Sequence, residues 1–480
     1  MIKKNIRKNK GMIIVQTLVF AAIAVMIIGA LASFAATSVK SARITYNREQ
    51  AFQSAEAGID YYRWHLAHAS TDYTDGTYGL GYAHPLIDKN GNTIGQFSLN
   101  ITAPTQGSSL VKIKSTGSSS LDSTQLRKIS AQLAKPSIAE HAFAGNSAMR
   151  FGEGTEVFGS VHSNGGIRFD GLAHNLVTSG VATYTDSDSD ACTTSNSYGV
   201  HTCLGTHDPT SPTPLPARPD VFAAGRAMGQ PVISFSGFTD DVSKLKTTAQ
   251  TSGGFYRDTA GGGSVGYHIV LKTNDTFDLY KINSWASVDH CDSSGSEDLS
   301  WSINTQTLLG NYAFPTNGVI FIQDNLVVDG QINGARLTIT ASLLPEPSDT
   351  TQLKNIIINN DLSYTNYDGT DSIGLVAQGG VMVGMISDNN LKIDGALMAQ
   401  HKAVGRFYYN GSGCDYTKRS VISLYGMIAS YARYGFAFTD ETGYIIRNIN
   451  YDANLLYAPP PNFPLTSDQY QILSWQEVKN

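Results

Sequence analysis

Residues 11–39 read GMIIVQTLVFAAIAVMIIGALASFAATSV and contain no charged side chain. Five basic residues precede this stretch within the first ten positions, and Lys40 and Arg43 follow it. A helix rises 1.5 Å per residue, so residues 12–36 are long enough to cross a hydrocarbon layer of about 30 Å. The stretch therefore predicts a single membrane-spanning helix.

The helical pattern continues beyond the apolar stretch, because apolar residues recur there at spacings of three and four. They are Phe52, Ala55, Ile59, Tyr62 and Leu66. No proline occurs before Pro85, so we predict one helix over residues 12–69, half in lipid and half packed on a domain outside it. A cleaved secretory signal and a plain anchor with a helical stalk are the alternatives.

Two short segments resemble the type IV pilins. A basic leader ends in Gly11 and is followed by an apolar run that begins at Met12, which is similar to a class III prepilin signal. Residues 50–59, QAFQSAEAGI, look like the helix motif of PilX-type minor pilins. The positions that carry this second resemblance are Ala51, Phe52, Ala55, Glu56, Ala57 and Gly58.

The resemblance implies a processing step and a set of partners. Prepilin peptidase would remove the leader, residues 1–11, by cutting after Gly11, and Met12 would become an N-methylated N-terminus. The apolar helix would hold the precursor in the cytoplasmic membrane and would later pack among other pilins and minor pilins at the cell surface. A small antiparallel sheet is expected after the helix, as in the head of a pilin.

Gln16 departs from the pattern of the major pilins. The fifth mature residue of those proteins is usually a glutamate, whose carboxylate meets the N-terminal amine of a neighbouring subunit. Glutamine removes the cost of a carboxylate in lipid and also removes that docking interaction. The pseudopilin of the related secretion systems that lacks this glutamate caps the tip, so we expect a tip-proximal subunit that primes or caps assembly.

Residues 70–136 contain three strand-like runs separated by polar turns. These runs cover residues 94–101, 110–115 and 125–133. We expect them to form the pilin-like β head, and Lys135-Pro136 marks its end.

The C-terminal part of the chain carries an internal period. Apolar runs begin at residues 319, 337, 356, 373 and 391, in steps of 17 to 19 residues. Turn pairs such as Asp394-Gly395 lie between them. Strands and tight turns at such a step predict a parallel β-helix, in which each coil buries its inner face against its neighbours. A β-sandwich is the alternative.

The remaining boundaries follow from this interpretation. We expect the first coils over residues 137–183 and the main solenoid over residues 266–440. Residues 184–265, which include a proline-rich run and a predicted short helix, are expected to form a surface insertion. Residues 441–480 contain four prolines and are expected to cap the open end of the solenoid.

The four cysteines are Cys192, Cys203, Cys291 and Cys414. None forms a CxxC pair, which argues against a zinc ribbon. The first two flank a short polar segment, as the cysteines of a loop-closing disulfide do, and the other two are then left to pair. Four unpaired thiols are the alternative.

An acidic run offers a weak calcium site. Asp186, Asp188 and Asp190 alternate with serines and supply carboxylate oxygens. The run lacks the glycine and the glutamate of an EF-hand loop, so a solvated acidic loop is the stronger interpretation and no resident metal is expected.

No motif assigns catalysis, and no cofactor is expected. Residues 262–266 match GxSxG, but that motif needs a strand before the serine and a helix after it, and here a strand-like run follows. The sequence has no GxxxxGK[ST] phosphate loop and no HExxH pair. Outside the leader, 29 basic residues stand against 40 acidic ones, so bulk binding of nucleic acid is not expected.

Together these observations predict a non-enzymatic minor pilin with a large β-helical head. The head is expected to serve adhesion or surface contact, with a host, glycan or other surface as ligand. Several tyrosines fall among or between the predicted coils. Exposed, they would supply contacts to a glycan or protein surface, whereas buried inside the solenoid they are core residues. They include Tyr364, Tyr367, Tyr408, Tyr409, Tyr425, Tyr431 and Tyr434. Two alternatives stay open: a membrane-anchored enzyme acting on surface polysaccharide, and a plain anchored structural protein.

Overall fold

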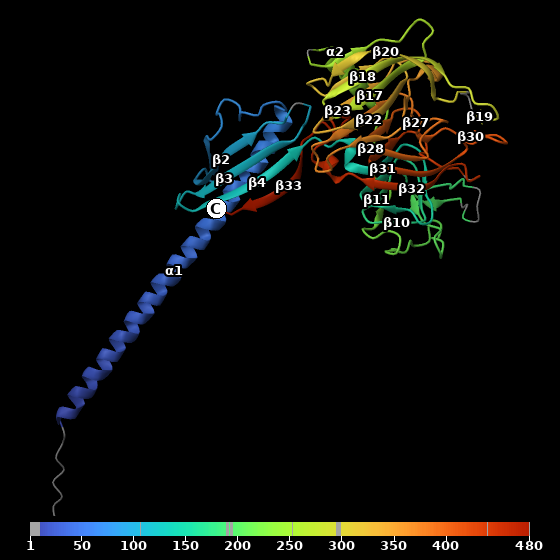
Figure 1. The fold of residues 1–480 in the computed structure, drawn as a ribbon. Coiled ribbons are helices and arrows are strands. Elements are labelled where there is room, and N and C mark those ends of the chain that lie inside the picture. The colour runs from blue at the N-terminus through green and yellow to red at the C-terminus, as the bar shows by residue number, and fades with distance from the viewer. Residues whose placement is uncertain are drawn as a thin grey trace, which may run out of the picture. The chain divides into compact units, whose positions relative to one another are not determined.

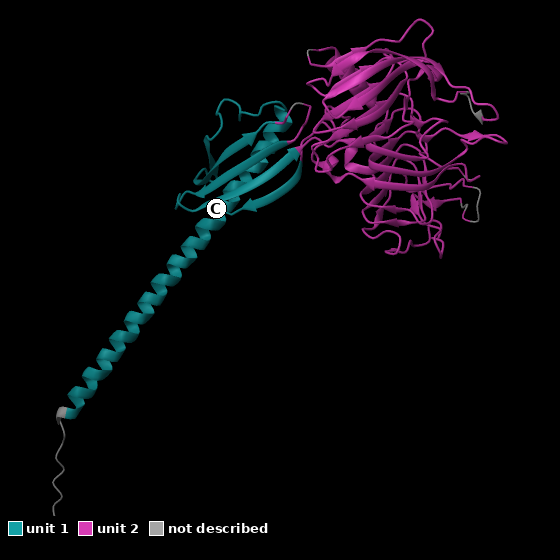
Figure 2. Cartoon of the chain, in the orientation of Figure 1, with its two compact units in different colours: residues 1–103, 111–133, 472–480 teal, residues 104–110, 134–471 magenta. Residues whose placement is uncertain are grey.

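The computed structural model describes residues 10–105, 107–188, 192, 195–251, 253–293, 299–438 and 440–479. The chain forms two compact units (Figure 2). Unit 1 comprises residues 1–103, 111–133 and 472–480, and unit 2 comprises residues 104–110 and 134–471. The fold is mainly β, with one long N-terminal helix, a small antiparallel sheet and a parallel solenoid, so the predicted fold class is confirmed.

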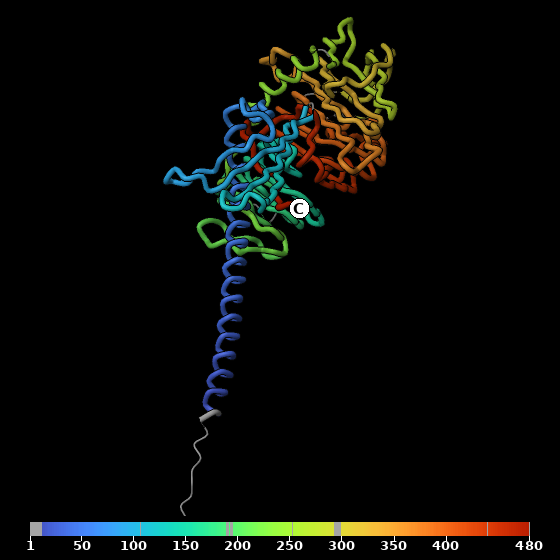
Figure 3. Tube along the Cα trace, turned by 90° about the vertical axis from the view of Figure 1, so that its left-hand side faces the viewer, coloured from blue at the N-terminus to red at the C-terminus, as the bar shows by residue number. Residues whose placement is uncertain are grey.

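Unit 1 consists of the long helix and the small sheet. Helix α1 spans Lys10–His68 without interruption (Figure 1 and Figure 3). Five strands form the sheet in the order β1-β2-β3-β4-β33. Their bounds are Ala83–Ile87, Thr93–Thr102, Val111–Ser119, Leu126–Ala134 and Gln471–Val478. The three strands predicted for the head correspond to β2, β3 and β4, whereas β1 and the C-terminal β33 were not predicted.

Unit 2 is a three-sided solenoid of parallel strands. We name its longest side face A, on which ten strands follow one another in the order β16-β21-β23-β26-β28-β31-β5-β8-β11-β15. Their bounds, in that order, are Phe255–Arg257, Val319–Ile322, Arg336–Ala341, Ser372–Ala377, Asn390–Ala399, Lys418–Ser430, His141–Gly145, Ser160–Ser163, Val177–Ser179 and Arg226–Ala227. Parallel pairing on every step excludes the β-sandwich.

The other two sides are shorter and are each divided in two. Face B holds β17-β22-β24-β27-β29 and, separately, β6-β9-β14. Their bounds are Gly266–Lys272, Leu326–Ile332, Ile356–Ile357, Val381–Val383, Val404–Arg406, Met149–Phe151, Ile167–Phe169 and Val200–His201. Face C holds the second half of β22, β25 (Leu362–Tyr364), the first halves of β28 and β31, and β32 (Gly443–Tyr451). Separately, it holds β7 (Glu156–Val157) with β10 (Leu172–Ala173).

The coils do not stack in chain order. The chain enters at β5, which pairs with β31, and runs through β8 and β11 to β15 at one end of face A. Helix α2 (Phe238–Gln250) follows, and β16 then begins at the other end of face A. The later coils return from there to β31. Figure 1 accordingly shows the last strands, orange to red, between the yellow strands and the green ones.

This order corrects the expected surface insertion. Residues 184–265 do contain the predicted helix, but β14, β15 and β16 of the same segment pair with solenoid strands. The segment carries the chain from one end of the stack to the other, so it belongs to the solenoid.

The predicted regular period of the solenoid is also wrong. Successive register partners on face A are Val319, Thr338, Gly374, Ala396 and Met427, which gives steps of 19, 36, 22 and 31 residues.

The expected C-terminal cap is wrong as well. Strand β32 pairs along β31 and so extends the solenoid, and β33 joins the sheet of unit 1. The proline-rich segment between them lies against face A, where Arg336 donates to the carbonyl of Pro459 and Thr338 donates to that of Pro461. Proline carbonyls accept hydrogen bonds although proline cannot donate one, so the segment covers a sheet face without extending it.

Two further elements complete unit 2. The buried side of α2 packs against the outer surface of face A through Phe238, Val242 and Leu245. Strands β18 (Thr276–Trp285) and β20 (Ile303–Ala313) extend β17 as an antiparallel sheet. Unit 2 also contains two short antiparallel strand pairs. They are β12 (Thr183–Tyr184) with β13 (Ser197–Tyr198), and β19 (Asp292–Ser293) with β30 (Tyr409–Asn410).

Candidate functional site

The first half of α1 is apolar and exposed. An 18-residue window within it has a mean hydropathy of 2.6, and none of the window is buried. By length and composition this helix is able to cross a membrane. Its two threonine hydroxyls are internally satisfied, because Thr17 donates to the carbonyl of Ile13 and Thr37 donates to that of Ser33. Such bonds lower the cost of placing a hydroxyl in hydrocarbon.

The predicted processing residues lie at the start of this half. Gly11 is in the first turn of α1, and Met12 follows it with an exposed side chain. Gln16 lies one turn further along, also exposed. None of the three touches the head sheet, so cleavage, N-methylation and the tip role of Gln16 stay predictions from the resemblance.

The second half of α1 packs on the head sheet through small residues. Ala51 and Ala55 are fully buried, and a Cβ placed on Gly117 of β3 would lie 2.2 Å from the carbonyl oxygen of Ala51 and 2.3 Å from the amide nitrogen of Ala55. A Cβ on Gly58 would lie 2.3 Å from the hydroxyl of Ser115. Helix and strand backbones therefore approach so closely that only small residues fit between them.

The PilX-like motif thus has a packing role in this chain. Its small members Ala51, Ala55 and Gly58 face the sheet, whereas Glu56 is exposed. Phe52 and Ala57 are half-buried. Sequence reasoning found these helix residues but missed their partners on the sheet, although an isolated glycine within a strand is a signal of close backbone approach.

Phe52 holds the last strand of the chain to the head. Its ring meets the ring of Trp475 in β33 edge to face at 6.0 Å, and the guanidinium of Arg127 lies 5.5 Å from its centroid. Arg127 also forms an ion pair with Glu477 of β33. These contacts attach the C-terminal strand to an element that begins near the N-terminus.

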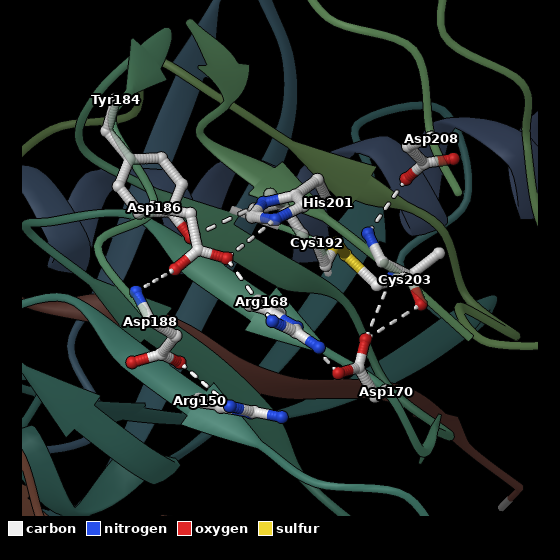
Figure 4. A network of polar contacts seen from close by, with 12 residues as sticks. Arg150, Arg168, Asp170, Tyr184, Asp186, Asp188, Cys192, His201, Cys203 and Asp208 are labelled. Carbon is white, nitrogen blue, oxygen red and sulfur yellow. Dashed lines mark hydrogen bonds and ion pairs between the residues drawn. A yellow bond between two sulfur atoms is a disulfide. The ribbon is translucent and has the colours of Figure 1, made fainter. Parts of the chain in front are cut away.

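A second cluster lies on the β6-β9-β14 part of face B (Figure 4). Arg150, Arg168 and His201 occupy register positions directly beside one another on these three strands. Arg168 and His201 are 5% and 3% exposed. A row of neighbouring basic side chains repels itself unless carboxylates compensate it.

Carboxylates from the surrounding loops supply that compensation. Asp170 accepts from Arg168 at 2.6 Å, and Asp186 lies 3.6 Å from Arg168 and 3.3 Å from His201. Asp188 pairs with Arg150 at 3.3 Å. Burial lowers the pKa of His201 and outweighs the opposing effect of Asp186, which favours the neutral imidazole at neutral pH.

This network bears on the weak calcium site. Arg433 donates to Asp188 at 2.6 Å and lowers the pKa of that carboxyl, while Asp186 faces Arg168 and His201. Both carboxylates already face cations, so the geometry favours ion pairing over calcium binding. Asp190, the third member, lies outside the described residues.

Both disulfide pairs are present in the structure. Cys192 is joined to Cys203, and Cys291 is joined to Cys414. The sulfurs of the first pair and a ring nitrogen of His201 lie within 4.8 Å of one another, which is a spacing that a metal could use. Because a disulfide sulfur is not a thiolate, this group offers no metal site in the oxidised state.

Carboxylates also meet at the corner between faces B and C. Burial and the charges of Asp361 and Asp329 raise the pKa of Asp388. Asp361 lines an open polar groove of about 730 Å³ together with Lys272, Asn274 and Gln331. The same Asp361 accepts the backbone N–H of Lys392 at 2.7 Å, so it also has a structural role in the turn.

The tyrosines among the coils divide into two groups. Tyr364 and Tyr409 are buried in the solenoid, at 2% and 0% exposed, and are core residues. Tyr367 and Tyr431 are exposed at 44% and 38%. Of these four, Tyr367 and Tyr431 are therefore the ones that a ligand could reach, and the hydroxyl of Tyr367 already donates to Asp394 at 2.6 Å.

Comparisons with known proteins find likenesses among solved structures. No family model matches the chain, and no curated protein matches it. Among solved structures, the crystal structure of the competence-associated pilin ComZ from Thermus thermophilus is similar, at 14% sequence identity, over 90% of this chain and 98% of that chain. The TM-score is 0.30, a value at which the likeness determines neither the fold nor the function of this chain.

Proposed function

We propose that the chain is a minor pilin-like subunit of a type IV pilus-like filament, located at or near the tip. In this proposal α1 anchors the precursor in the cytoplasmic membrane, prepilin peptidase cuts after Gly11, and the mature helix then packs among other pilins. The subunit primes or caps assembly and has no enzymatic activity. The solenoid is presented at the cell surface for adhesion or surface contact.

The division of α1 carries this proposal. One continuous helix has an exposed apolar first half and a second half docked on an antiparallel sheet. An exposed apolar surface of that length needs lipid or other apolar helices to cover it, and a filament subunit uses both in turn. The basic leader and Gly11 at the start of the helix support the processing step.

The test is the mass of the N-terminal peptide from cell-surface material. We expect a methylated peptide that begins at Met12. Gly11→Leu should block cleavage and remove the chain from sheared filaments. Gly29→Leu is the matched control, because a Cβ at Gly29 meets nothing within 4 Å, and it should be processed normally. A peptide that begins at Met1 in the unsubstituted chain would overturn the proposal.

The tip location has its own test in Gln16. Glu at this position would restore a carboxylate able to meet a neighbouring N-terminal amine, at a cost in lipid unless it is paired. We expect Gln16→Glu to move immunogold label from filament ends toward the shaft. Label spread along the shaft in the unsubstituted protein would contradict the tip location and leave the pilin-like role standing.

A polysaccharide-acting enzyme is the second candidate, favoured by the corner carboxylates. A raised carboxyl pKa beside a second carboxylate is one feature of a general acid in glycoside hydrolysis. The raised pKa of Asp388, to which the charge of Asp361 contributes, is the observation behind this candidate. The test is sugar release from cell-surface polysaccharide by the purified chain and by Asp388→Asn. Release that Asp388→Asn abolishes would support this candidate, whereas no release would exclude it for the polysaccharide used.

A further inference from the structure

The turn between β3 and β4 presents an exposed leucine beside α1. Leu121 is 74% exposed, more than any other large apolar side chain of the head sheet. It lines an apolar groove of about 640 Å³ whose other wall is one stripe of α1, including Val39, Lys40 and Arg43. On the helix the groove runs from Ala35 to Asn47, so it spans the end of the uncharged stretch.

The turn is held in place without help from the leucine side chain. The backbone N–H of Leu121 donates to the hydroxyl of Ser119, which itself donates to Asn47 of α1. Asp122 accepts from both the backbone N–H and the hydroxyl of Thr124. An exposed leucine that contributes nothing to the core of its own unit is a candidate for contact with something else.

The length of α1 places this groove close to the membrane surface. Within the uncharged stretch, the 28 residues from Met12 to Val39 rise about 42 Å as a helix, and a hydrocarbon core is about 30 Å thick. A stretch that exceeds the core by about 12 Å is accommodated by tilting. Tilt toward the side of α1 that carries the groove lowers Leu121 to the lipid boundary.

The charges of the groove fit a lipid surface. Lys40 and Arg43 follow the apolar stretch directly, and neither has an ion-pair partner among the described residues. Basic side chains at this level of a spanning helix interact with lipid phosphates. Asp122 also lines the groove, and its hydrogen bonds with Thr124 lower the pKa of its carboxyl and keep it ionised. Lys40, Arg43 and Asp122 together therefore leave a net positive charge at the groove.

We propose that the β3–β4 turn is a foot by which the head of the membrane-held precursor rests on the bilayer. Leu121 enters the boundary between headgroups and acyl chains, and Lys40 and Arg43 bind the phosphates of anionic lipids. The occupant is lipid because the groove continues the apolar surface that lipid already covers in the precursor. The foot sets the direction in which α1 tilts. This inference rests on the membrane-anchored precursor of the proposed function.

The test uses the full chain with its leader, reconstituted into phosphatidylcholine vesicles that contain phosphatidylglycerol and brominated acyl chains. Leu121→Trp adds emission to that of the four native tryptophans. We expect bromine to quench the added emission about twofold, because an interfacial side chain lies roughly 5–10 Å into the headgroup–acyl boundary. Lys40→Gln with Arg43→Gln should reduce that quenching in anionic vesicles and leave it unchanged in neutral ones.

Leu80→Trp is the matched control. Leu80 is also exposed, at 54%, but it lies at a level farther along α1. Its neighbour Gly81 donates to the carbonyl of Leu99, and Leu99 pairs with Ser115 in the next strand. Ser115 in turn lies against Gly58 of α1. The level of Gly58 is about 28 Å beyond Val39 along the helix. We expect no quenching at Leu80→Trp.

Each outcome separates the foot from the anchor. Protease protection of α1 with no quenching at Leu121→Trp would overturn the foot and leave the anchored precursor standing. Quenching that appears equally at Leu80→Trp would show head unfolding or non-specific adsorption and would also overturn the foot. Loss of protection of α1 would overturn both proposals. A blue shift without bromine quenching that grows with protein density would assign the groove to a second copy of the chain.

Discussion

The head sheet and the solenoid bury their interiors in opposite ways. In the head, α1 lies on β3 with little between the two backbones, and Ala55 and Gly117 mark the closest approach. In the solenoid, large side chains from successive coils stack on one another. Phe151 stacks on Phe169 of the next coil at 4.6 Å between ring centroids, and it meets Phe143 of its own coil edge to face at 5.0 Å. One region depends on the absence of side-chain atoms and the other on their presence.

This difference predicts opposite sensitivities to substitution. Removal of a buried aromatic ring leaves a cavity that neighbouring coils cannot close, because each coil is fixed by the pairing of its strands. Addition of a single methyl group between a helix and a strand forces two backbones apart. Large-to-small changes should therefore be most harmful in the solenoid, and small-to-large changes in the head.

The largest expected effect is that of Phe151→Ala. Phe151 is fully buried, so we expect the solenoid to lose about 4 kcal/mol of unfolding free energy. Chemical denaturation followed by hydrogen exchange in β9 measures this loss, and exchange in β3 should not change because the two units have separate cores. Phe158→Ala is the control. Phe158 is 50% exposed and should cost about 1 kcal/mol. Equal losses would contradict the stacked core.

Much of the fold was predictable because its determinants are local. The uncharged stretch and the apolar stripe predicted α1, and turn residues between short runs predicted β2, β3, β4 and the solenoid class. The stacking order was not predictable, because it depends on pairs such as Ile428 with Phe143, which leave no trace in either segment alone. The predicted step of 17 to 19 residues per coil was wrong because β22, β28 and β31 each run along two faces. The number of residues between the starts of successive strands therefore did not equal the length of a coil.

The candidate sites divide along the same line. The motif that contains Ala51 and Gly58 was visible, because its spacing follows the helix. The row formed by Arg150, Arg168 and His201 was not, because only the register of three strands brings these residues together. The two cysteine pairs found from spacing and elimination agree with the pairs in the structure.

The second prediction tests the head side of the comparison. Gly117→Ala places a methyl group within 2.3 Å of two backbone atoms of α1, so we expect a loss of about 3 kcal/mol and faster exchange along the second half of α1. Gly152→Ala in the solenoid is the matched control, because a Cβ there meets nothing within 4 Å, and it should change stability by less than about 0.5 kcal/mol. A neutral Gly117→Ala would mean that helix and sheet are not in close contact.

The smallest expected effect concerns pH and the solenoid alone. Burial, with a smaller contribution from His162, lowers the pKa of His141 to about 4. The unfolded chain, with a histidine pKa near 6.5, binds more protons than the folded chain between these values, so stability falls as pH drops through this window and the loss is complete below pH 4. At pH 5 the loss attributable to His141 amounts to about 2 kcal/mol.

His141→Gln isolates this contribution from its neighbours. Burial raises the pKa of Glu140, and that shift acts in the opposite direction, because stability from a raised carboxyl pKa is lost as pH rises. The measurement is therefore the difference in unfolding free energy between the two proteins at pH 7 and at pH 5. We expect His141→Gln to be less pH-dependent than the unsubstituted chain. Identical pH profiles would show that His141 is accessible to water. The packing of face A at β5 would then be looser than the packing of α1 on the head sheet.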